Sequence, residues 1–212
     1  YFEPTAAYFG CKKANEPLHI QWNPLTDEVE VVNYSAGQRK GLTAKAQVLN
    51  MDGSVAWEKE VAVDSEEDTT NKCIKLEFPA NLTSAHYVKL TLTEAGKVVS
   101  DNFYLRGTEE GNYQALRELP KVQMQPVIET VKGADGTWSA TVALENSSNT
   151  PALMIRVNVL GAGDGEQILP MFYSDNYFSL LPGEKKQVNI HWKDEDTRGE
   201  QPQIIVSGYN VQ

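Results

Sequence analysis

The chain has 212 residues, 41% of them hydrophobic and 9% aromatic, which is ordinary for one or two globular domains and too apolar for a disordered segment. The formal net charge is −10 and no stretch is strongly basic, which argues against binding to nucleic acid. No apolar run approaches the ~20 residues of a membrane-spanning helix, so we expect neither nucleic acid nor a membrane as a partner.

The opening segment, residues 1–17, is aromatic but shows no strand-like alternation. Its aromatic side chains are Tyr1, Phe2, Tyr8 and Phe9. Large apolar side chains of this kind need a surface to cover them. We expect the segment either to be mobile in the isolated chain or to fold back onto the domain that follows it. The chain does not begin with Met, and we interpret it as part of a longer protein.

Residues 18–106 carry the period-two alternation of β-strands, punctuated by turn signals such as Asp52-Gly53 and Ala95-Gly96. The acidic run 64–70 is predicted to be a solvated loop. The expected strands are Leu18–Trp22, Glu28–Tyr34, Leu42–Val48, Val55–Val63, Ile74–Phe78, Val88–Leu92 and a run ending at Leu105. Short strands with a turn every 8–12 residues are typical of an immunoglobulin-like sandwich.

Residues 107–120 interrupt this pattern and are predicted to be a linker, with one helical turn before Pro120. Alternation resumes over residues 121–212, most clearly from Trp138 to Leu144 and from Leu153 to Val159. The predicted fold class is therefore all-β, with two tandem immunoglobulin-like β-sandwich domains at 18–106 and 121–212.

The residues that usually carry chemistry are scattered. The three histidines all fall in predicted strands, where a side chain on the polar face is the expected role. The acidic residues fall in turns or on polar strand faces, where a solvated carboxylate is the expected role. Cys11 and Cys73 are too few for a metal site and are expected to be free thiols. The histidines, acidic residues and cysteines of the sequence thus give no reason to expect a catalytic residue, a metal site or a cofactor.

The four tryptophans could stack on sugar rings, but three of them share a strand face with aliphatic neighbours. Trp57, Trp138 and Trp192 are therefore predicted to be core residues. Trp22 stands at a strand end near Pro24, and its role is left open between core and sugar contact.

Two stretches resemble a known family. Residues 174–184, Ser-Asp-Asn-Tyr-Phe-Ser-Leu-Leu-Pro-Gly-Glu, resemble the last immunoglobulin-like domain of family 2 glycoside hydrolases of the β-mannosidase and exo-β-glucosaminidase group. Residues 5–20 resemble the exit from the catalytic barrel in that group, which makes 1–17 a post-barrel connecting segment. In the family, the catalytic glutamates lie on the barrel, and no residue of this chain matches them.

The resemblance implies non-catalytic domains that brace the barrel of the parent chain and help to wall its cleft. The parent would be an exo-acting hydrolase of β-mannosides or β-glucosaminides, located in the periplasm or outside the cell. Candidate contacts with the barrel or with carbohydrate are Asp175, Asn176, Tyr177 and Trp22, and Tyr8 and Phe9 are candidates for docking to the barrel. An oligosaccharide is thus a second candidate partner. Two alternatives stay open: a stand-alone carbohydrate-binding module, and an interaction or adhesin array on a cell surface.

Overall fold

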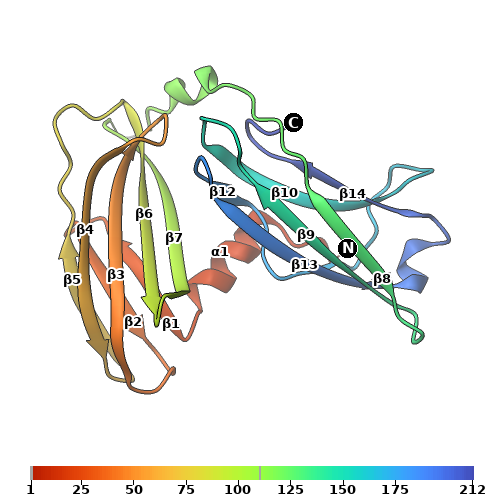
Figure 1. Ribbon diagram of the computed structural model, residues 1–212, viewed down its shortest axis with the longest axis horizontal. Coiled ribbons are helices and arrows are strands. Elements are labelled where there is room, and N and C mark those ends of the chain that lie inside the picture. The colour runs from red at the N-terminus through yellow and green to blue at the C-terminus, as the bar shows by residue number, and fades with distance from the viewer. Residues whose placement is uncertain (1, 110) are drawn as a thin grey trace. The chain divides into compact units, whose positions relative to one another are not determined.

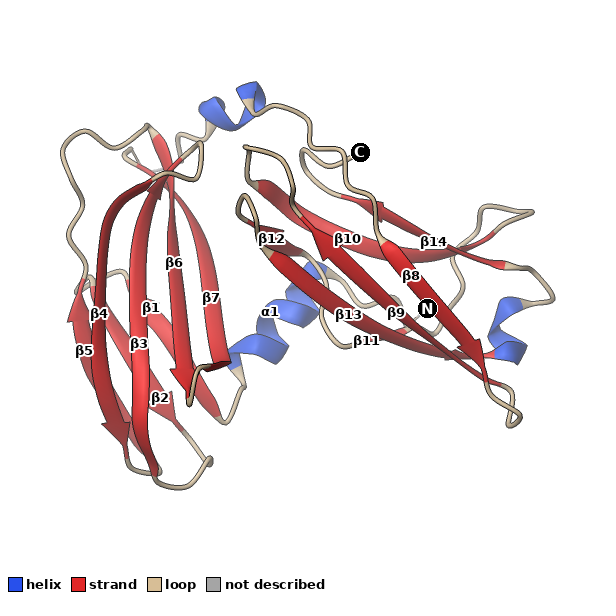
Figure 2. Ribbon diagram, in the orientation of Figure 1, coloured by secondary structure: helices blue, strands red, loops and turns tan. Residues whose placement is uncertain are grey.

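The computed structural model describes residues 2–109 and 111–212, and in these ranges it confirms the predicted all-β class (Figures 1 and 2). Tyr1, one of the predicted surface-seeking aromatics, lies outside the described residues. The chain forms two compact units. Residues 11–118 make one, here called the first sandwich. Residues 2–10 and 119–212 make the other, the second sandwich. None of the described helices is long and apolar enough to cross a bilayer.

In the first sandwich, a sheet of four strands in the order β4-β3-β6-β7 faces a sheet of three strands in the order β1-β2-β5, counted over the described residues. The strands are β1 (Leu18–Asn23), β2 (Glu28–Asn33), β3 (Arg39–Asn50), β4 (Val55–Ser65), β5 (Thr69–Lys75), β6 (Ala85–Glu94) and β7 (Lys97–Gly107), followed by the 3-10 helix η1 (Gln114–Glu118). All pairings are antiparallel. The inward residues of both sheets form one apolar core, and each fully buried aliphatic side chain contributes about 1.5–3 kcal/mol.

The β3–β4 hairpin forms at the predicted Asp52-Gly53 turn. A carboxylate oxygen of Asp52 accepts hydrogen bonds from the backbone N–H and the hydroxyl of Ser54, at 2.9 and 2.6 Å. A register shift lies just beyond the turn, because Val48 pairs with Trp57 while Leu49 pairs with Val55. This bulge turns Val55 out of the core, and its side chain is 50% exposed although the alternation placed it with Trp57.

The strand expected over 74–78 lies several residues earlier. β5 begins at Thr69 and ends at Lys75, and β4 ends at Ser65, so four of the seven residues of the predicted acidic loop belong to strands. A tight turn with Asp68 at φ +58 connects β4 to β5. β5 is the edge strand beside β2, where polar side chains face water on one side of the sheet, and the hydrophobic alternation therefore underestimates its length.

In the second sandwich, a sheet in the order β11-β13-β9-β8 faces a sheet in the order β12-β10-β14. The strands are β8 (Val127–Lys132), β9 (Thr137–Glu145), β10 (Ala152–Gly161), β11 (Phe172–Tyr173), β12 (Phe178–Leu180), β13 (Lys185–Lys193) and β14 (Pro202–Ser207), and the 3-10 helix η2 (Asp194–Thr197) lies between the last two. Along β13, Val188, Ile190 and Trp192 are buried and their neighbours are exposed, as the alternation predicts.

The helix α1 (Ala6–Ala14) is short enough to be marginal without tertiary contacts. Its first half belongs to the second sandwich and its last half to the first sandwich. The buried side chain of α1 is Phe9, 5% exposed. The helix ends where Asn15 donates from its backbone and side chain to the Cys11 carbonyl, two residues before Pro17.

Candidate functional site

The turn at residues 174–178 is organised by the buried side chain of Asn176, which is 4% exposed. Its amide oxygen accepts a hydrogen bond from the Val157 N–H, and its amide nitrogen donates to the Val157 carbonyl, both at 2.8 Å. β12 pairs with β10 through Ile155 and Phe178, so the Asn176 side chain continues this pairing by one more residue. Asn176 is therefore a structural clamp that fixes the turn to β10.

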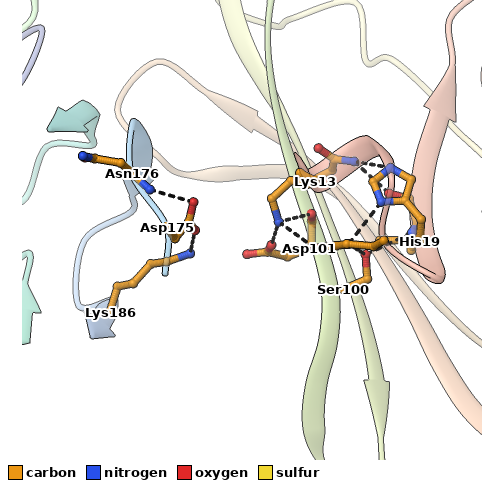
Figure 3. Close-up of polar contacts among 10 residues, drawn as sticks. Lys13, His19, Ser100, Asp101, Asp175, Asn176 and Lys186 are labelled. Atoms are coloured by element: carbon orange, nitrogen blue, oxygen red, sulfur yellow. Dashed lines mark hydrogen bonds and ion pairs between the residues drawn. The ribbon is translucent and has the colours of Figure 1, made fainter. Parts of the chain in front are cut away.

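Asp175 is the polar group that this clamp presents. One carboxylate oxygen accepts a hydrogen bond from the Asn176 N–H at 2.8 Å, and the other lies 2.5 Å from the ammonium of Lys186 on β13 (Figure 3). About a quarter of each side chain in this ion pair is exposed. The Lys186 ammonium also lies 4.9 Å from the ring centre of Phe178. The pair is partly solvated and its two charges compensate each other, which suits a contact surface better than proton transfer.

Tyr177 and Phe9 meet in an aromatic cluster within the second sandwich. Tyr177 has a left-handed backbone, with φ +57. Its ring centre lies 6.0 Å from that of Phe9, and the ring of Phe9 in turn lies edge-on to Tyr173 at 6.5 Å. Tyr8 stays 55% exposed while its ring contacts Phe9 at 5.1 Å. Burial raises the pKa of the Tyr173 hydroxyl well above its usual range.

A second contact ties the opening segment to the same sandwich. The Glu3 carboxylate lies 2.7 Å from the Arg156 guanidinium and accepts a hydrogen bond from Gln167 at 3.1 Å. We expected residues 1–16 to be mobile or to fold back onto the first sandwich. That prediction is wrong for residues 2–10, which pack on the second sandwich. Sequence alternation could not show this, because the partners of Phe9 are more than 160 residues away.

Tyr8 and Phe9 thus have different surroundings, and their docking to a barrel stays a prediction. Tyr8 has an exposed ring for such a contact. Phe9 is almost fully buried, and its ring contacts the rings of Tyr8 and Tyr177.

Trp22 lies in the first sandwich and is 7% exposed. The guanidinium carbon of Arg106 stands 4.7 Å from the ring centre of Trp22, and the rings of Phe78 and Tyr104 flank it at 5.9 and 5.7 Å. Trp22 and the 174–178 turn therefore belong to different units. A sugar contact at Trp22 stays a prediction, and it requires Arg106 or Phe78 to move.

The core assignment of the other tryptophans holds fully for Trp192, which is 1% exposed. Trp138 and Trp57 are only partly buried, although they pack against the cores of their sandwiches. Trp138 stacks on Trp192 with ring centres 5.8 Å apart, and its indole N–H donates to the Asp194 carboxylate at 2.7 Å. Trp138 lies near the start of β9 and its indole N–H has a polar partner. These two features explain why Trp138 is less buried than the alternation along the strand predicts.

Two histidines depart from the predicted polar-face role, because His19 and His86 are about 95% buried. His19 lies between the Glu16 carboxylate, 3.2 Å from Nδ1, and the Asn102 amide, 3.1 Å from Nε2. Burial lowers the pKa of His86, and the charge of Arg106 acts in the same direction. Only His191 is exposed, and its ring stacks on Phe172 at 5.0 Å.

The remaining candidates for chemistry are single residues. Within 2–109 and 111–212, no group of three or more His, Cys, Asp or Glu side chains is arranged to hold a metal ion. Among the described acidic residues, Glu30 departs from the predicted solvated role: it is 6% exposed and accepts hydrogen bonds from Gln21 and Asn23. Both cysteines are free thiols, as predicted, with Cys11 exposed and Cys73 partly buried.

Comparisons with known proteins cover nearly the whole chain. The family described as the exo-beta-D-glucosaminidase Ig-fold domain matches residues 102–211, and the mannosidase Ig/CBM-like domain family matches residues 28–106. An exo-beta-D-glucosaminidase of Streptomyces avermitilis is 31% identical over all of this chain and 26% of its own length. The chain thus spans about a quarter of the curated relatives that it matches.

Comparison with solved structures points to the same group of proteins. The exo-chitosanase CsxA of Amycolatopsis orientalis superposes on all of this chain and on 28% of its own, with a TM-score of 0.91 and 29% identity. A β-D-mannosidase from Dictyoglomus thermophilum has a TM-score of 0.66 at 14% identity, covering 97% of this chain and 23% of its own, which indicates a shared fold alone.

Proposed function

The chain belongs to the Ig-fold domains of the exo-β-D-glucosaminidase and mannosidase group of glycoside hydrolase family 2, and we propose that it braces the catalytic barrel of such an enzyme. The observation that carries the proposal is the extent of the match. The whole chain superposes at a TM-score of 0.91 on little more than a quarter of an exo-chitosanase. We therefore infer that the chain serves the remaining domains of a longer parent protein.

Among the substrate classes of the group, we favour β-glucosaminides for the parent enzyme. The relatives described as exo-beta-D-glucosaminidases match all of this chain at up to 31% identity. The solved β-D-mannosidase is 14% identical. We further propose a periplasmic or extracellular location, on the family resemblance.

The bracing surface that we propose is the 174–178 turn together with the exposed ring of Tyr8. Asn176 holds this turn to β10 by two hydrogen bonds, and Phe9 lies beneath the rings of Tyr8 and Tyr177. The Asp175 carboxylate is fixed by Lys186. A pre-organised surface of this kind loses little conformational entropy when another domain packs on it.

Hydrogen exchange on the intact parent enzyme and on the 212-residue chain tests the bracing role. We expect amides of residues 5–9 and 174–178 to exchange more slowly in the parent, because the barrel covers them. Equal protection in both samples would show that neither stretch contacts the barrel.

Variants of the parent sharpen the test. Tyr8→Ala and Asp175→Ala should lower the thermal midpoint of the parent more than that of the isolated chain. Tyr34→Ala is the matched control, because Tyr34 is 73% exposed in the first sandwich and has no place in the proposed surface. The isolated chain should not hydrolyse aryl β-glucosaminides. Turnover that survives repurification and is lost on mutation of an acid in this chain would overturn the non-catalytic assignment.

A further inference from the structure

A hollow in the second sandwich is lined by none of the residues of the 174–178 turn and has no role in the proposed bracing surface. Its volume is about 260 Å³, large enough for a group the size of a sugar ring. It is lined by Lys132, Trp138, Asp194, Thr197, Gly199, Glu200, Gln201 and Pro202. Three elements meet there, since Lys132 ends β8, Trp138 is the second residue of β9 and Asp194 begins η2.

The hollow already contains a site for a cation, occupied by one of its own side chains. The Lys132 ammonium lies 2.7 Å from the Asp194 carboxylate and 5.2 Å from the ring centre of Trp138. An aromatic face beside a carboxylate is a favourable environment for an ammonium group. The Trp138 indole also stacks parallel to that of Trp192, with ring centres 5.8 Å apart, and this contact helps to fix its orientation.

The Lys132 side chain is a replaceable occupant. It is 46% exposed, its partner Asp194 is 45% exposed, and such a pair is worth at most about 1 kcal/mol. Asp194 would keep a second partner if Lys132 left, because the Trp138 indole N–H donates to it at 2.7 Å. Lysine has a flexible stem, so its departure from the hollow needs no backbone change.

Glu200 gives the hollow a second acidic group. Its carboxylate accepts a hydrogen bond from the Gly163 N–H at 2.9 Å. A side chain at Gly163 would collide with it, because an added Cβ would stand 2.6 Å from the carboxylate oxygen. The lining carries one positive charge, on Lys132, and two negative charges, on Asp194 and Glu200, so it favours a cationic ligand over an anion.

We propose that this hollow is a binding site for an amino-sugar unit, whose ammonium takes the place of the Lys132 ammonium between Asp194 and Trp138. The remaining lining groups, among them the Gln201 amide, suit the ring hydroxyls. The choice of β-linked glucosamine as ligand rests on the proposed function of the parent. Binding here is independent of the bracing role, and either can fail without the other.

Nuclear magnetic resonance of the 212-residue chain tests the site through its tryptophan side chains. The probe is a β-1,4-linked glucosamine trisaccharide at about pH 6, where its amines are protonated. The indole N–H signals of Trp138 and Trp192 should shift, whereas those of Trp22 and Trp57 in the first sandwich should not. The N-acetylated trisaccharide and cellotriose, which lack the ammonium, should bind at least about threefold more weakly, since they forgo the ion pair.

Variants decide whether Lys132 is a competitor or a ligand-binding group. Lys132→Met, with Lys132→Gln as a second version, should tighten binding about threefold or more. Glu200→Gln should weaken it by a similar factor. Lys45→Met is the matched control, because Lys45 forms a comparable ion pair with Glu58 at 3.0 Å in the first sandwich. Three results would each overturn the proposal: no shift at Trp138 with ~10 mM trisaccharide, equal binding of all three sugars, or weaker binding by both Lys132 variants.

Discussion

The side chain of Asn176 bonds to both backbone groups of Val157, at 2.8 Å each, and so acts as an extra strand residue beside β10. Replacing Asn176 by Ala leaves a buried N–H and a buried carbonyl without these partners. Each such loss costs about 1–3 kcal/mol, so Asn176→Ala should destabilise the second sandwich by about 2–6 kcal/mol in urea unfolding. Asn189→Ala, at an exposed position of β13, is the control and should change stability by less than about 0.5 kcal/mol.

Phe9 is expected to stabilise the second sandwich, although it lies more than 100 residues before the strands of that unit. Its side chain is 5% exposed and contacts the rings of Tyr173 and Tyr177. Phe9→Ala should therefore cost about 3 kcal/mol, through lost burial and the cavity left behind. The neighbouring Tyr8→Ala is the matched comparison and should cost much less, since Tyr8 is 55% exposed. Similar small losses for both variants would show that the opening segment is only loosely attached.

The strands were predictable from sequence wherever one face is buried and the other is solvated. β13 is the clearest case, since Val188, Ile190 and Trp192 alternate with exposed neighbours. The prediction failed where alternation carries no information. β5 is a largely polar edge strand, and the bulge near Val55 shifts the register by one residue without a signal in composition.

The candidate site was predictable only in part, for a similar reason. The aromatic turn at 174–178 was found by resemblance, but the role of Asn176 depends on a partner on another strand. The burial of Phe9 depends on Tyr173, 164 residues away, and no local pattern encodes such a contact. The sequence did not predict the hollow at Trp138, because the alternation of apolar residues along the strand assigned that indole to the core.

Trp192 and Trp138 should differ in their contributions to stability. Trp192 is 1% exposed, so Trp192→Ala should cost about 3–5 kcal/mol. Trp138 is only partly buried, and Trp138→Ala should cost less, near the lower end of that range or below it. Urea unfolding followed by circular dichroism measures both changes. Equal losses would show that the two stacked indoles act as one core residue.

The two free thiols should react at very different rates. Burial raises the pKa of the Cys73 thiol to about 11, so almost none of it is thiolate at neutral pH. Cys11 is exposed on α1. Brief treatment of the folded chain with iodoacetamide should therefore give a single adduct, located at Cys11 by peptide mass spectrometry. A Cys11→Ser variant should stay unmodified until it is unfolded, and early modification of Cys73 would contradict the burial argument.

The first sandwich should lose stability in acid when Glu16 becomes protonated. Burial by itself raises the pKa of Glu16, but hydrogen bonds from His19 and Ser100 and the charge of Lys13 outweigh it and hold the pKa below the usual value of 4.5. A carboxyl with a lowered folded-state pKa contributes stability that is present above its unfolded pKa. That contribution is lost as the pH falls below 4.5 and through the folded-state pKa, because the folded state must then take up a proton that the unfolded state already holds.

The Glu16→Gln variant isolates this contribution from those of the other carboxylates. At about pH 6 the variant should be less stable than the wild type, since the neutral amide cannot form an ion pair with Lys13 and accepts only weaker, uncharged hydrogen bonds from His19 and Ser100. This difference should shrink as the pH falls below 4.5 and through the folded-state pKa, because Glu16 then becomes protonated in the wild type as well. Urea midpoints measured across this range give the comparison, with Glu66→Gln as an exposed control. A constant difference between wild type and Glu16→Gln at all pH values would show that packing, and not the charge of Glu16, joins residue 16 to His19 and Ser100.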